Sequence, residues 1–486
     1  MSADPPPLPN GLNFQLFIDG SWRPAHDNAK FDVVNPSNEQ AIGEVASAAP
    51  QDAVAAVEAA ERALPAWSAT PPRQRGEVLR AAYARMIDRL EEIAVLISIE
   101  NGKALPDARA EVRYAAEFFR WFSEEAVRLA GDVRIAPSGD YRIVVQRQPI
   151  GVCALVTPWN YPAAMATRKI GPALAAGCTV VLKPASDTPL TALLLADLLQ
   201  EAGVPPGVVN VLPSRRSGQV VQTLLAQRPV RKVSFTGSTE VGVTLLHGAA
   251  DRVISSSMEL GGNAPFLVFE DADIDAAVGG AMIAKIRNGG EACTAANRFY
   301  VHDAVADEFT AKFAAAMSNL RIGPGYAPGV ELGPVINAAA RSNVAALVDD
   351  ALTRGAQIFS QGAVPDGPGY WVAPAVLVDV HPDSRMLAEE IFAPVAPVVR
   401  FATEADAISL ANATEFGLIS YLYTRDLRRG LRVAESLEAG MIGLNRGLVS
   451  DPSAPFGGVK QSGLGREGGH EGIAEYAEEK YIATEW

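Results

Sequence analysis

Three polar side chains of types that carry out acyl chemistry stand in turn-rich segments of this chain: Cys293, Asn160 and Glu259. A cysteine thiolate can attack a carbonyl carbon, and an amide N–H can stabilise the negative oxygen that forms. A carboxylate can then activate the water that releases the acyl group. With a cofactor to accept the hydride, the three side chains suffice for oxidising an aldehyde to an acid, and we predict that they form the catalytic centre.

Each of these residues also has an ordinary structural interpretation. A lone cysteine is most often a small buried hydrophobe, Asn160 could belong to a turn or cap, and Glu259 could be a solvated surface acid. The glycines before Cys293 favour a turn instead, where a backbone amide can stabilise a thiolate. Cys153 and Cys178 lie in apolar, strand-like runs, so we expect both to be core residues.

A strand-to-helix turn from Phe235 to Gly242 contains Ser238, and its hydroxyls and free amides suit a pyrophosphate at a helix N-terminus. A plain helix N-cap is the alternative. The turn lacks the Gly-x-Gly-x-x-Gly pattern, so a standard Rossmann phosphate loop is not predicted. Lys183 ends another expected strand and could be a fixed cation for ribose or phosphate oxygens, although surface lysines are common.

The elements that position these side chains alternate between strands and helices. Expected strands at 152–156 and 179–183 enclose an expected helix at 163–176, and a second alternating series begins beyond residue 259. Such alternation predicts parallel sheets covered on both faces, as in doubly wound folds. Residues 52–101 and 107–129 have helical spacing and predict a helical N-terminal layer, and the other expected helices are 189–202, 274–286, 305–320, 338–354 and 404–411. The other expected strands are 142–148, 208–212, 232–235, 265–269, 299–301, 395–401, 419–423 and 441–445, and residues 457–469 read as a loop.

Chain length, net charge and cysteine content predict the number of domains and argue against some kinds of binding site. A chain of 486 residues exceeds the usual size of one hydrophobic core, which predicts two or more domains. The formal net charge of −14 argues against a protein that binds nucleic acid through its phosphates, so an anionic cofactor must find local positive potential. Three cysteines give neither a disulfide framework nor a metal-binding spacing, and we predict free thiols and no metal site.

The N-terminus has no basic segment followed by an apolar run, so no secretory signal is expected. The apolar stretches are much shorter than the roughly 20 residues of a membrane-spanning helix. We therefore predict a cytoplasmic protein that binds neither nucleic acid nor a membrane.

Taken together, these segments resemble the aldehyde dehydrogenase superfamily from about Phe17 to Tyr481. The resemblance implies that Cys293 attacks the aldehyde, while the Asn160 side chain and the Cys293 amide hold the oxyanion. Hydride then passes to a nicotinamide, and Glu259 activates the water that hydrolyses the thioester. The cofactor contacts implied by the resemblance are Thr157, Trp159, Lys183, Ser186, Ser238, Glu390 and Phe392.

The same resemblance implies two doubly wound, Rossmann-like α/β domains and a small β oligomerisation arm. We assign residues 1–130 and 149–258 to a discontinuous cofactor-binding domain and residues 259–465 to the catalytic domain. The arm takes residues 131–148 and 466–486. A homodimer or homotetramer is the expected assembly.

Within the superfamily, the likeness is strongest to succinate-semialdehyde dehydrogenases. There, the segments matching Arg168 and Arg287 bring two arginines to the substrate carboxylate, and the segment from Asn445 to Phe456 makes Ser450 a hydrogen-bond donor. Arginine binds a carboxylate through two parallel hydrogen bonds, whereas a neutral aldehyde needs neither charge. Arg168 could instead be a surface cation, and Arg287 a charge at a helix C-terminus.

Some positions depart from the family pattern. Glu291 replaces the usual glutamine, and its carboxylate would raise the pKa of the thiol if the two faced each other. Ala295 replaces a second cysteine, so a disulfide switch within that loop is excluded. Arg446, Asp451 and Pro452 make the third substrate loop atypical, which leaves open another semialdehyde or a neutral aldehyde.

The cofactor preference depends on Ser186. A glutamate there would hold the ribose hydroxyls of NAD and repel a 2′-phosphate, whereas serine removes that repulsion and can donate a hydrogen bond near Lys183. We therefore favour NADP over NAD.

The alternatives to a hydrolytic dehydrogenase are a CoA-acylating dehydrogenase, a thiol esterase, and a non-catalytic binding protein that retains the fold.

Overall fold

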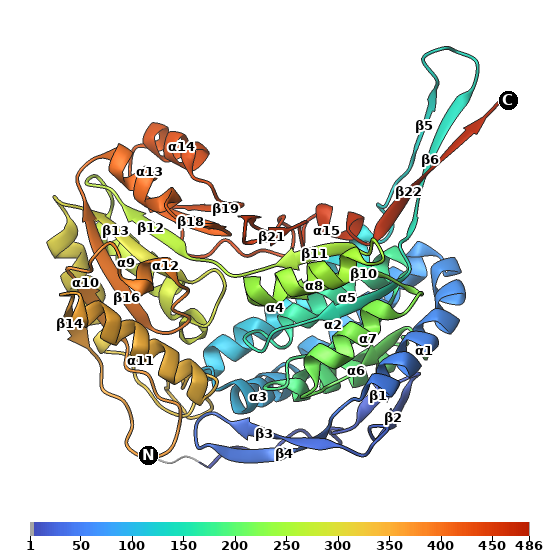
Figure 1. Ribbon diagram of the computed structural model, residues 1–486, viewed down its shortest axis with the longest axis horizontal. Coiled ribbons are helices and arrows are strands. Elements are labelled where there is room, and N and C mark those ends of the chain that lie inside the picture. Colours follow the sequence, from blue (N-terminus) through green and yellow to red (C-terminus); the bar gives the residue numbers. More distant parts are fainter. Residues whose placement is uncertain (1–3, 486) are drawn as a thin grey trace.

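Two mixed sheets carry the site residues in this computed structural model, which describes residues 4–485 (Figure 1). Residues 1–3 and 486, the outer ends of the expected first domain and arm, lie outside the described part. The order in the eight-stranded sheet is β2 (Ser21–Arg23), β1 (Leu16–Ile18), β9 (Val209–Val211), β8 (Thr179–Lys183), β7 (Val152–Val156), β10 (Val230–Thr236), β11 (Ser255–Glu259) and β21 (Gly463–Leu464).

The seven-stranded sheet lies on the opposite side of the molecule in Figure 1. Its order is β14 (Gln357–Gln361), β15 (Ala375–Val378), β16 (Val395–Phe401), β13 (Ala296–His302), β12 (Ala264–Val268), β18 (Ile419–Tyr423) and β19 (Met441–Leu444). Its central strands are parallel, and only β14 pairs antiparallel.

The carboxyl ends of four parallel strands meet at one edge of the eight-stranded sheet. In the register of β7, β8, β10 and β11, Val156 is opposite Lys183 and Phe235, and Thr236 is opposite Glu259. Ligands of open α/β sheets bind at this edge. The polar residues that follow these strands are therefore brought together by topology, as the sequence predicted.

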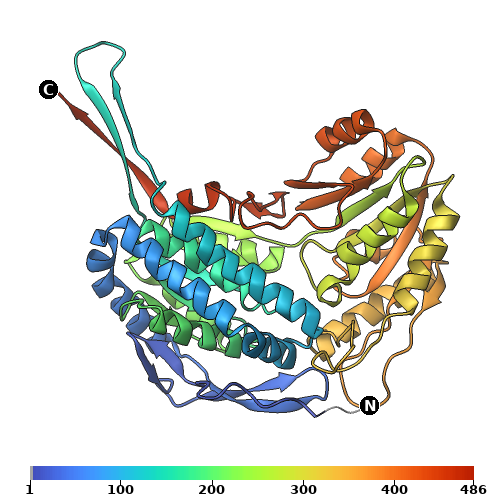
Figure 2. The same ribbon diagram turned by 180° about the vertical axis from the view of Figure 1, so that it is seen from behind.

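Helices cover both sheets (Figure 2). Those of the first half are α1 (Pro50–Ala69), α2 (Pro72–Asp88), α3 (Leu90–Asn101), α4 (Leu105–Glu125), α5 (Ala164–Ala176), α6 (Pro189–Glu201), α7 (Ser217–Ala226) and α8 (Thr239–Ala250). Those of the second half are α9 (Ile274–Ile286), the 3-10 turn η1 (Arg287–Gly290), α10 (Ala306–Ser318), α11 (Ala338–Thr353), α12 (Arg385–Ala388), α13 (Glu404–Asn412), α14 (Leu427–Ser436) and α15 (Glu471–Ala474).

Helix α5 is buried along its whole length because it lies between α4 and strands β7 and β8. A Cβ at Gly171 would lie 3.1 Å from the Phe122 ring and 3.4 Å from the Phe118 carbonyl oxygen, so glycine permits the close approach of α4. This burial extends to Arg168 and Lys169, whose charged groups must find partners inside the protein.

A three-stranded ribbon projects from the body and ends near the C-terminus (Figure 1). Strand β6 (Arg142–Pro149) pairs antiparallel with both β5 (Asp132–Ile135) and β22 (Ala477–Thr484). Val133, Ile135 and Tyr481 are exposed on it. The remaining strands are β3 (Lys30–Asn35), which pairs with β4 (Gln40–Ala46), and β17 (Phe416–Gly417), which pairs with β20 (Val459–Lys460).

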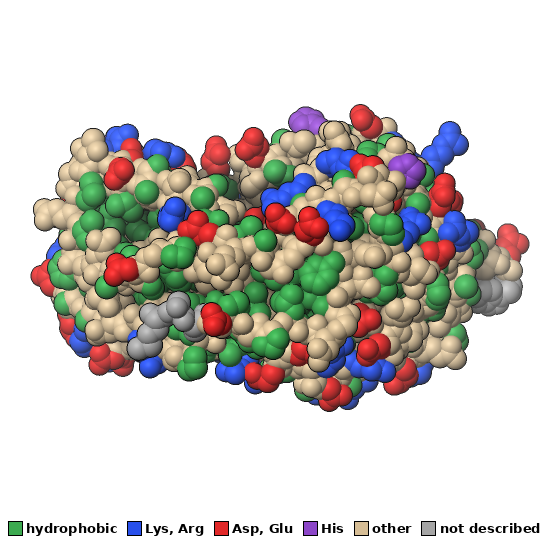
Figure 3. Space-filling model, turned by 90° about the horizontal axis from the view of Figure 1, so that it is seen from below, with side chains coloured by type: hydrophobic (Ala, Val, Ile, Leu, Met, Phe, Trp, Pro, Cys, Tyr) green, Lys and Arg blue, Asp and Glu red, His purple; other side chains and the backbone are tan. Residues whose placement is uncertain are grey.

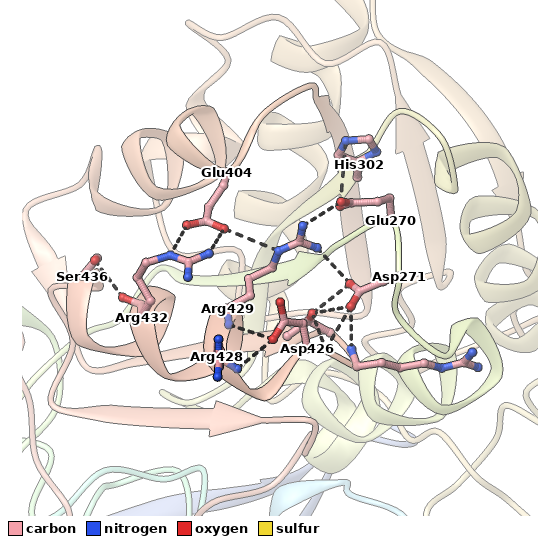
Figure 4. Close-up of polar contacts among 11 residues, drawn as sticks. Glu270, Asp271, His302, Glu404, Asp426, Arg428, Arg429, Arg432 and Ser436 are labelled. Carbon is pink, nitrogen blue, oxygen red and sulfur yellow. Dashed lines mark hydrogen bonds and ion pairs between the residues drawn. The ribbon is translucent and has the colours of Figure 1, made fainter.

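An ion-pair network holds α14 against the seven-stranded sheet. Arg429 reaches Glu270 at 2.7 Å, Asp271 at 3.0 Å and Glu404 at 3.4 Å, and Arg432 contacts Glu404 at 2.8 Å (Figure 4). Isolated surface ion pairs contribute little, but a shared guanidinium ties three chain segments together.

Several sequence expectations need correction. The helical layer expected over 52–101 consists of three helices, because Pro72 starts a second one and Arg89 leaves the helical conformation before the third. Helices α7, α8 and α14 and strands β1 to β4, β11, β14, β15 and β22 were not predicted. The expected loop at 457–469 contains two short strands, β20 and β21.

No helix within residues 4–485 is long and apolar enough to cross a membrane. On the face seen in Figure 3, acidic and basic side chains are interspersed around hydrophobic ones. The three cysteines are free, and Cys153 and Cys178 are buried as predicted. No group of three or more potential metal ligands occurs among the described His, Cys, Asp and Glu residues.

Candidate active site

A cavity of about 210 Å³ lies where loops from both halves of the molecule meet. Many of the residues predicted from the sequence line it, and they come from segments far apart in the chain. The predicted residues in its wall are Trp159, Asn160, Arg168, Ser238, Arg287, Cys293, Glu390, Phe392 and Ser450. Thr157, Lys183, Ser186 and Glu259 are not part of that wall.

Cys293 is partly exposed and follows the tight turn η1. Asn288 and Gly289 in this turn have φ values of 57° and 64°, in the left-handed region that favours asparagine and glycine. A Cβ at Gly290 would lie 2.5 Å from the Ala393 carbonyl oxygen, so the turn also needs glycine for space. The predicted turn is confirmed, and it presents the thiol to the cavity.

Burial raises the pKa of the Cys293 thiol to about 12. Glu390 and Glu259 act in the same direction, whereas Arg168 and Arg287 favour the thiolate and oppose the shift. The thiol is therefore protonated near neutral pH in the ligand-free protein, and attack on a carbonyl requires removal of its proton.

Alkylation of Cys293 by iodoacetamide in the cofactor-free protein should therefore be slow near neutral pH. Below the raised pKa, the rate should increase about tenfold per pH unit, because only the thiolate reacts. Peptide mapping would separate this label from label on the buried Cys153 and Cys178. A rate that levels off below the ordinary cysteine pKa of about 8.5 would contradict the assigned environment.

Asn160 follows β7 and is buried. Its side-chain Nδ2 donates to the Glu291 carbonyl oxygen at 3.0 Å, and its own carbonyl accepts from Lys103 Nζ at 2.7 Å. One N–H of the side-chain amide is thus used within the protein, which leaves the second for an oxyanion.

The Glu291 carboxylate turns away from the thiol. Its Oε1 accepts from the Ile336 backbone N–H at 3.0 Å, and burial raises the pKa of this carboxyl well above its usual value. The carboxylate is thus held by the Ile336 segment, which is the geometric answer to the question that this departure from the family pattern raised.

Glu259 ends β11 and lies behind the cavity wall. Neither carboxylate oxygen has a hydrogen-bond partner among the described residues. Burial, followed by the nearby Glu467, raises the pKa of Glu259 well above its usual value, while Arg168 and Lys169 oppose this shift. A carboxyl group with a raised pKa and free oxygens suits proton transfer.

Arg168 is 1% exposed, so its interpretation as a surface cation is wrong. Its Nε lies 2.5 Å from Glu467 Oε2, and its guanidinium lies 4.2 Å from the centre of the Phe456 ring. Glu467 also binds Lys169 Nζ at 2.5 Å. Arg168 therefore reaches the cavity as a cation that already has an anionic partner.

Arg287 follows the last residue of α9, so it does stand at a helix C-terminus, as the alternative interpretation expected. Its side chain nevertheless lines the cavity. Its Nη2 donates to Thr294 Oγ1 at 3.1 Å, and its guanidinium lies 5.7 Å from the centre of the Tyr161 ring. It forms no ion pair with any described carboxylate. Arg287 is thus an available cation for an acidic ligand.

Two aromatic rings stand at the other side of the cavity. Trp159 and Phe392 pack edge to face with ring centroids 5.5 Å apart. Beside them, Glu390 Oε1 accepts from the Gly262 backbone N–H at 3.3 Å, and burial raises the pKa of Glu390 to about 8. Ser238 caps α8 by accepting from the Val241 N–H at 3.4 Å, so the N-cap interpretation is confirmed for it.

Lys183 is buried at the carboxyl end of β8 and makes no hydrogen bond or ion pair through Nζ within residues 4–485. Burial lowers the pKa of Lys183 to about 8, and Asp187 opposes the shift. The Thr157 N–H donates to the Lys183 carbonyl oxygen at 3.2 Å, and Ser186 is half-buried nearby in the chain. These groups border the same sheet edge outside the main cavity.

Tyr114, Tyr161, Met165 and Phe456 also line the cavity, and the sequence analysis missed them. Arg168 and Arg287 both favour the ionised form of Tyr114, although burial dominates and raises its pKa. In an amphipathic helix such as α4, an aromatic residue is usually expected to pack in the hydrophobic core. The sequence therefore held no signal that distinguished Tyr114, which lines the cavity, from the core residues beside it.

Comparison with known proteins identifies the family to which this chain belongs. The model of the aldehyde dehydrogenase family matches residues 22–482. This chain belongs to the aldehyde dehydrogenase family. The predicted fold class and the prediction of an oxidoreductase acting on aldehydes are confirmed.

Individual relatives are similar over nearly their whole length. A succinate-semialdehyde dehydrogenase of Paenarthrobacter nicotinovorans is 56% identical over 441 residues, 91% of this chain and 98% of the relative. A glutarate-semialdehyde dehydrogenase of Pseudomonas aeruginosa is 49% identical over 96% of this chain and 97% of its own. The crystal structure of an NADP-dependent Escherichia coli enzyme superposes with a TM-score of 0.96 at 48% identity, covering 98% of both chains.

Proposed function

We propose that this aldehyde dehydrogenase uses NAD(P) to oxidise a short aldehyde with a carboxylate at its far end, with succinic semialdehyde as the main substrate. The observation that carries the proposal is Arg287, a guanidinium in the cavity wall that forms no ion pair with any described carboxylate and has only a coulombic interaction with Asp107. A substrate carboxylate could bind this guanidinium through direct, charge-assisted hydrogen bonds. The similarity to semialdehyde dehydrogenases supports the same class of substrate.

In the first step the Cys293 thiol loses its proton to water, and Sγ forms a bond with the aldehyde carbon. The carbonyl oxygen becomes negative as the thiohemiacetal forms, and the free N–H of Asn160 and the Cys293 backbone N–H would stabilise it. Arg168 and Arg287 favour the thiolate electrostatically, so the cations that attract the substrate also promote attack.

The residues around the cavity fit a nicotinamide cofactor. Trp159, Glu390 and Phe392 would flank the nicotinamide end, and the capped N-terminus of α8 at Ser238 suits a phosphate. Lys183, a buried amine whose Nζ forms no hydrogen bond or ion pair with any described residue, fits an anionic or hydroxyl group. When bound, the cofactor supplies the hydride acceptor for the oxidation.

Loss of a hydride from the thiohemiacetal leaves a thioester on Cys293, and its hydrolysis requires a base, for which we propose Glu259. Neither oxygen of Glu259 has a hydrogen-bond partner among the described residues, and Glu259 does not line the cavity, so the side chain must turn toward Cys293 to activate water. A requirement for CoA and an acyl-CoA product would favour the CoA-acylating alternative instead.

Carboxylate recognition falls mainly to Arg287, in this proposal, because Glu467 already neutralises Arg168. Ser450 lines the same cavity and could donate to the carboxylate. For the cofactor, Ser186 and the unpaired Lys183 favour NADP, with NAD as the alternative. The NADP-dependent structural relative supports this preference.

Arg287→Ala should lower kcat/KM for succinic semialdehyde roughly tenfold to hundredfold, since hydrogen bonds to a charged group contribute about 1.5–3 kcal/mol. Neutral butanal should lose clearly less than succinic semialdehyde, because it makes no such bond and loses only the cation that favours the Cys293 thiolate. Initial rates with succinic and glutaric semialdehydes, butanal, and both NADP and NAD would measure this.

The exposed Arg62→Ala is a matched control that should leave both substrates unchanged. Arg168→Ala is a poorer test, because it would leave the buried Glu467 with one cation fewer and destabilise the protein. Equal losses for charged and neutral aldehydes in Arg287→Ala would refute the carboxylate assignment.

We further propose the domain division given above, in which residues 131–148 and 466–486 form an oligomerisation arm. The projection of β5, β6 and β22 and their exposed apolar side chains support it. A dimer or tetramer is the corresponding assembly, which light scattering of the purified protein would test.

A further inference from the structure

Asn288 connects the two loops that hold the proposed catalytic groups. Its Nδ2 donates to the Asn160 carbonyl oxygen at 3.0 Å and to the Glu291 carbonyl oxygen at 2.7 Å. Asn160 in turn donates from its own Nδ2 to the same Glu291 oxygen at 3.0 Å. These three residues, which we name the Asn288 clamp, form a closed ring of hydrogen bonds.

The backbone of Asn288 is fixed as well. Its N–H donates to Asp107 Oδ2 at 2.8 Å, and its φ of 57° is tolerated by asparagine better than by most other residues. Asn288 is 1% exposed. The turn before Cys293 is therefore tied to α4 through Asp107 and to the loop after β7 through Asn160.

The clamp determines how the Asn160 amide is oriented. The Glu291 carbonyl oxygen is an acceptor and cannot donate a hydrogen bond. A flipped Asn160 amide would replace the donor Nδ2 by the acceptor Oδ1 and set two oxygens against each other. The observed orientation uses one N–H of Asn160 in the clamp and leaves the other for a ligand. The Lys103 ammonium holds the Asn160 carbonyl from a further direction, at 2.7 Å.

We propose that Asn288 is a positioning residue that holds the Asn160 amide against the Cys293 turn, so that its free N–H meets the oxyanion formed there. This inference rests on the proposed function, because it requires Asn160 to bind the oxyanion. Asn288 itself touches neither substrate nor cofactor in this role.

Asn288→Asp tests the role with little change in shape, and aspartate also tolerates a positive φ. Its carboxylate cannot donate to the two carbonyl oxygens and would repel them. We expect kcat to fall roughly tenfold to hundredfold, less than the about 10²- to 10³-fold that loss of an oxyanion donor costs. The cofactor dissociation constant should stay within about twofold, since the clamp makes no cofactor contact.

Two further measurements separate positioning from general damage. Cofactor-independent hydrolysis of p-nitrophenyl acetate should fall with kcat, because thiol attack on an ester needs the same oxyanion site. Asn28→Asp is the matched control: Asn28 is exposed and has a φ of 58°, so this variant should retain both activities. Asn288→Gly, which keeps the backbone conformation, replaces Asn288→Asp if circular dichroism finds the latter unfolded.

A double-mutant cycle with Asn160→Ala decides the inference. If Asn288 acts through Asn160, its replacement should cost less than about twofold once Asn160 is alanine. An equal loss in both backgrounds, or unchanged kcat in Asn288→Asp and Asn288→Gly, would overturn the positioning role alone. Unchanged kcat in Asn160→Ala would overturn the oxyanion assignment and the positioning role with it.

Discussion

Cys293→Ala should abolish aldehyde oxidation while leaving cofactor binding intact. The thiol is the nucleophile in the proposed reaction, and no other described cysteine lines the cavity. Loss of a covalent nucleophile costs roughly 10⁵-fold or more in other enzymes, because no other group can form the intermediate. Stopped-flow measurement of cofactor reduction and titration of cofactor binding would establish the two properties separately.

Cys153→Ala is the control for this experiment. It removes a buried thiol from β7, so it should cost some stability but keep oxidation in the folded fraction. If Cys293→Ala kept more than about one hundredth of wild-type turnover, the nucleophile would have to be another group.

Glu259→Gln should allow a fast first turnover and strongly slow the turnovers that follow. Glutamine keeps the shape of the side chain but cannot take a proton from water, so a thioester should accumulate. We expect a burst of about one reduced cofactor per site, followed by steady turnover slowed roughly 10²- to 10⁴-fold. The burst and the steady phase can be read in one stopped-flow trace.

The rate of thioester release should also depend on pH, in a direction set by the pKa of Glu259. Burial and Glu467 raise the pKa of Glu259, so the ionised base becomes available only as pH rises. Thioester release should therefore accelerate with pH in the wild-type protein, and this dependence should vanish in Glu259→Gln. The exposed Glu435→Gln should behave like the wild type, whereas an unchanged steady phase in Glu259→Gln would remove its assignment as the base.

The sequence predicted the elements with strong local signals. The buried strands β7 and β8 and helix α9 have the predicted bounds, since continuous apolar runs between turns allow few other structures. Helices α7 and α8 and strand β22 were missed. The signals for these elements are weaker: α7 has only 10 residues, α8 buries only Gly242, Leu245 and Ala249, and most of β22 is exposed beside β6.

Site residues with distinctive motifs were predicted, but their surroundings were not. Nothing in the sequence pairs Arg168 with Glu467, because the contact depends on how the segment after β21 folds back over α5. The orientation of Glu291 likewise depends on the Ile336 N–H, from a distant segment. Burial of Glu259 and the clamp around Asn288 follow from tertiary packing, which local patterns do not record.

Mass spectrometry of Glu259→Gln, quenched after mixing with NADP and succinic semialdehyde, would show directly whether Cys293 carries the acyl group. We expect one acyl group per chain, attached through a thioester to Cys293 and absent when the cofactor is omitted. An intact protein without an acyl group after the burst, or an acyl group mapped to a residue other than Cys293, would contradict this expectation.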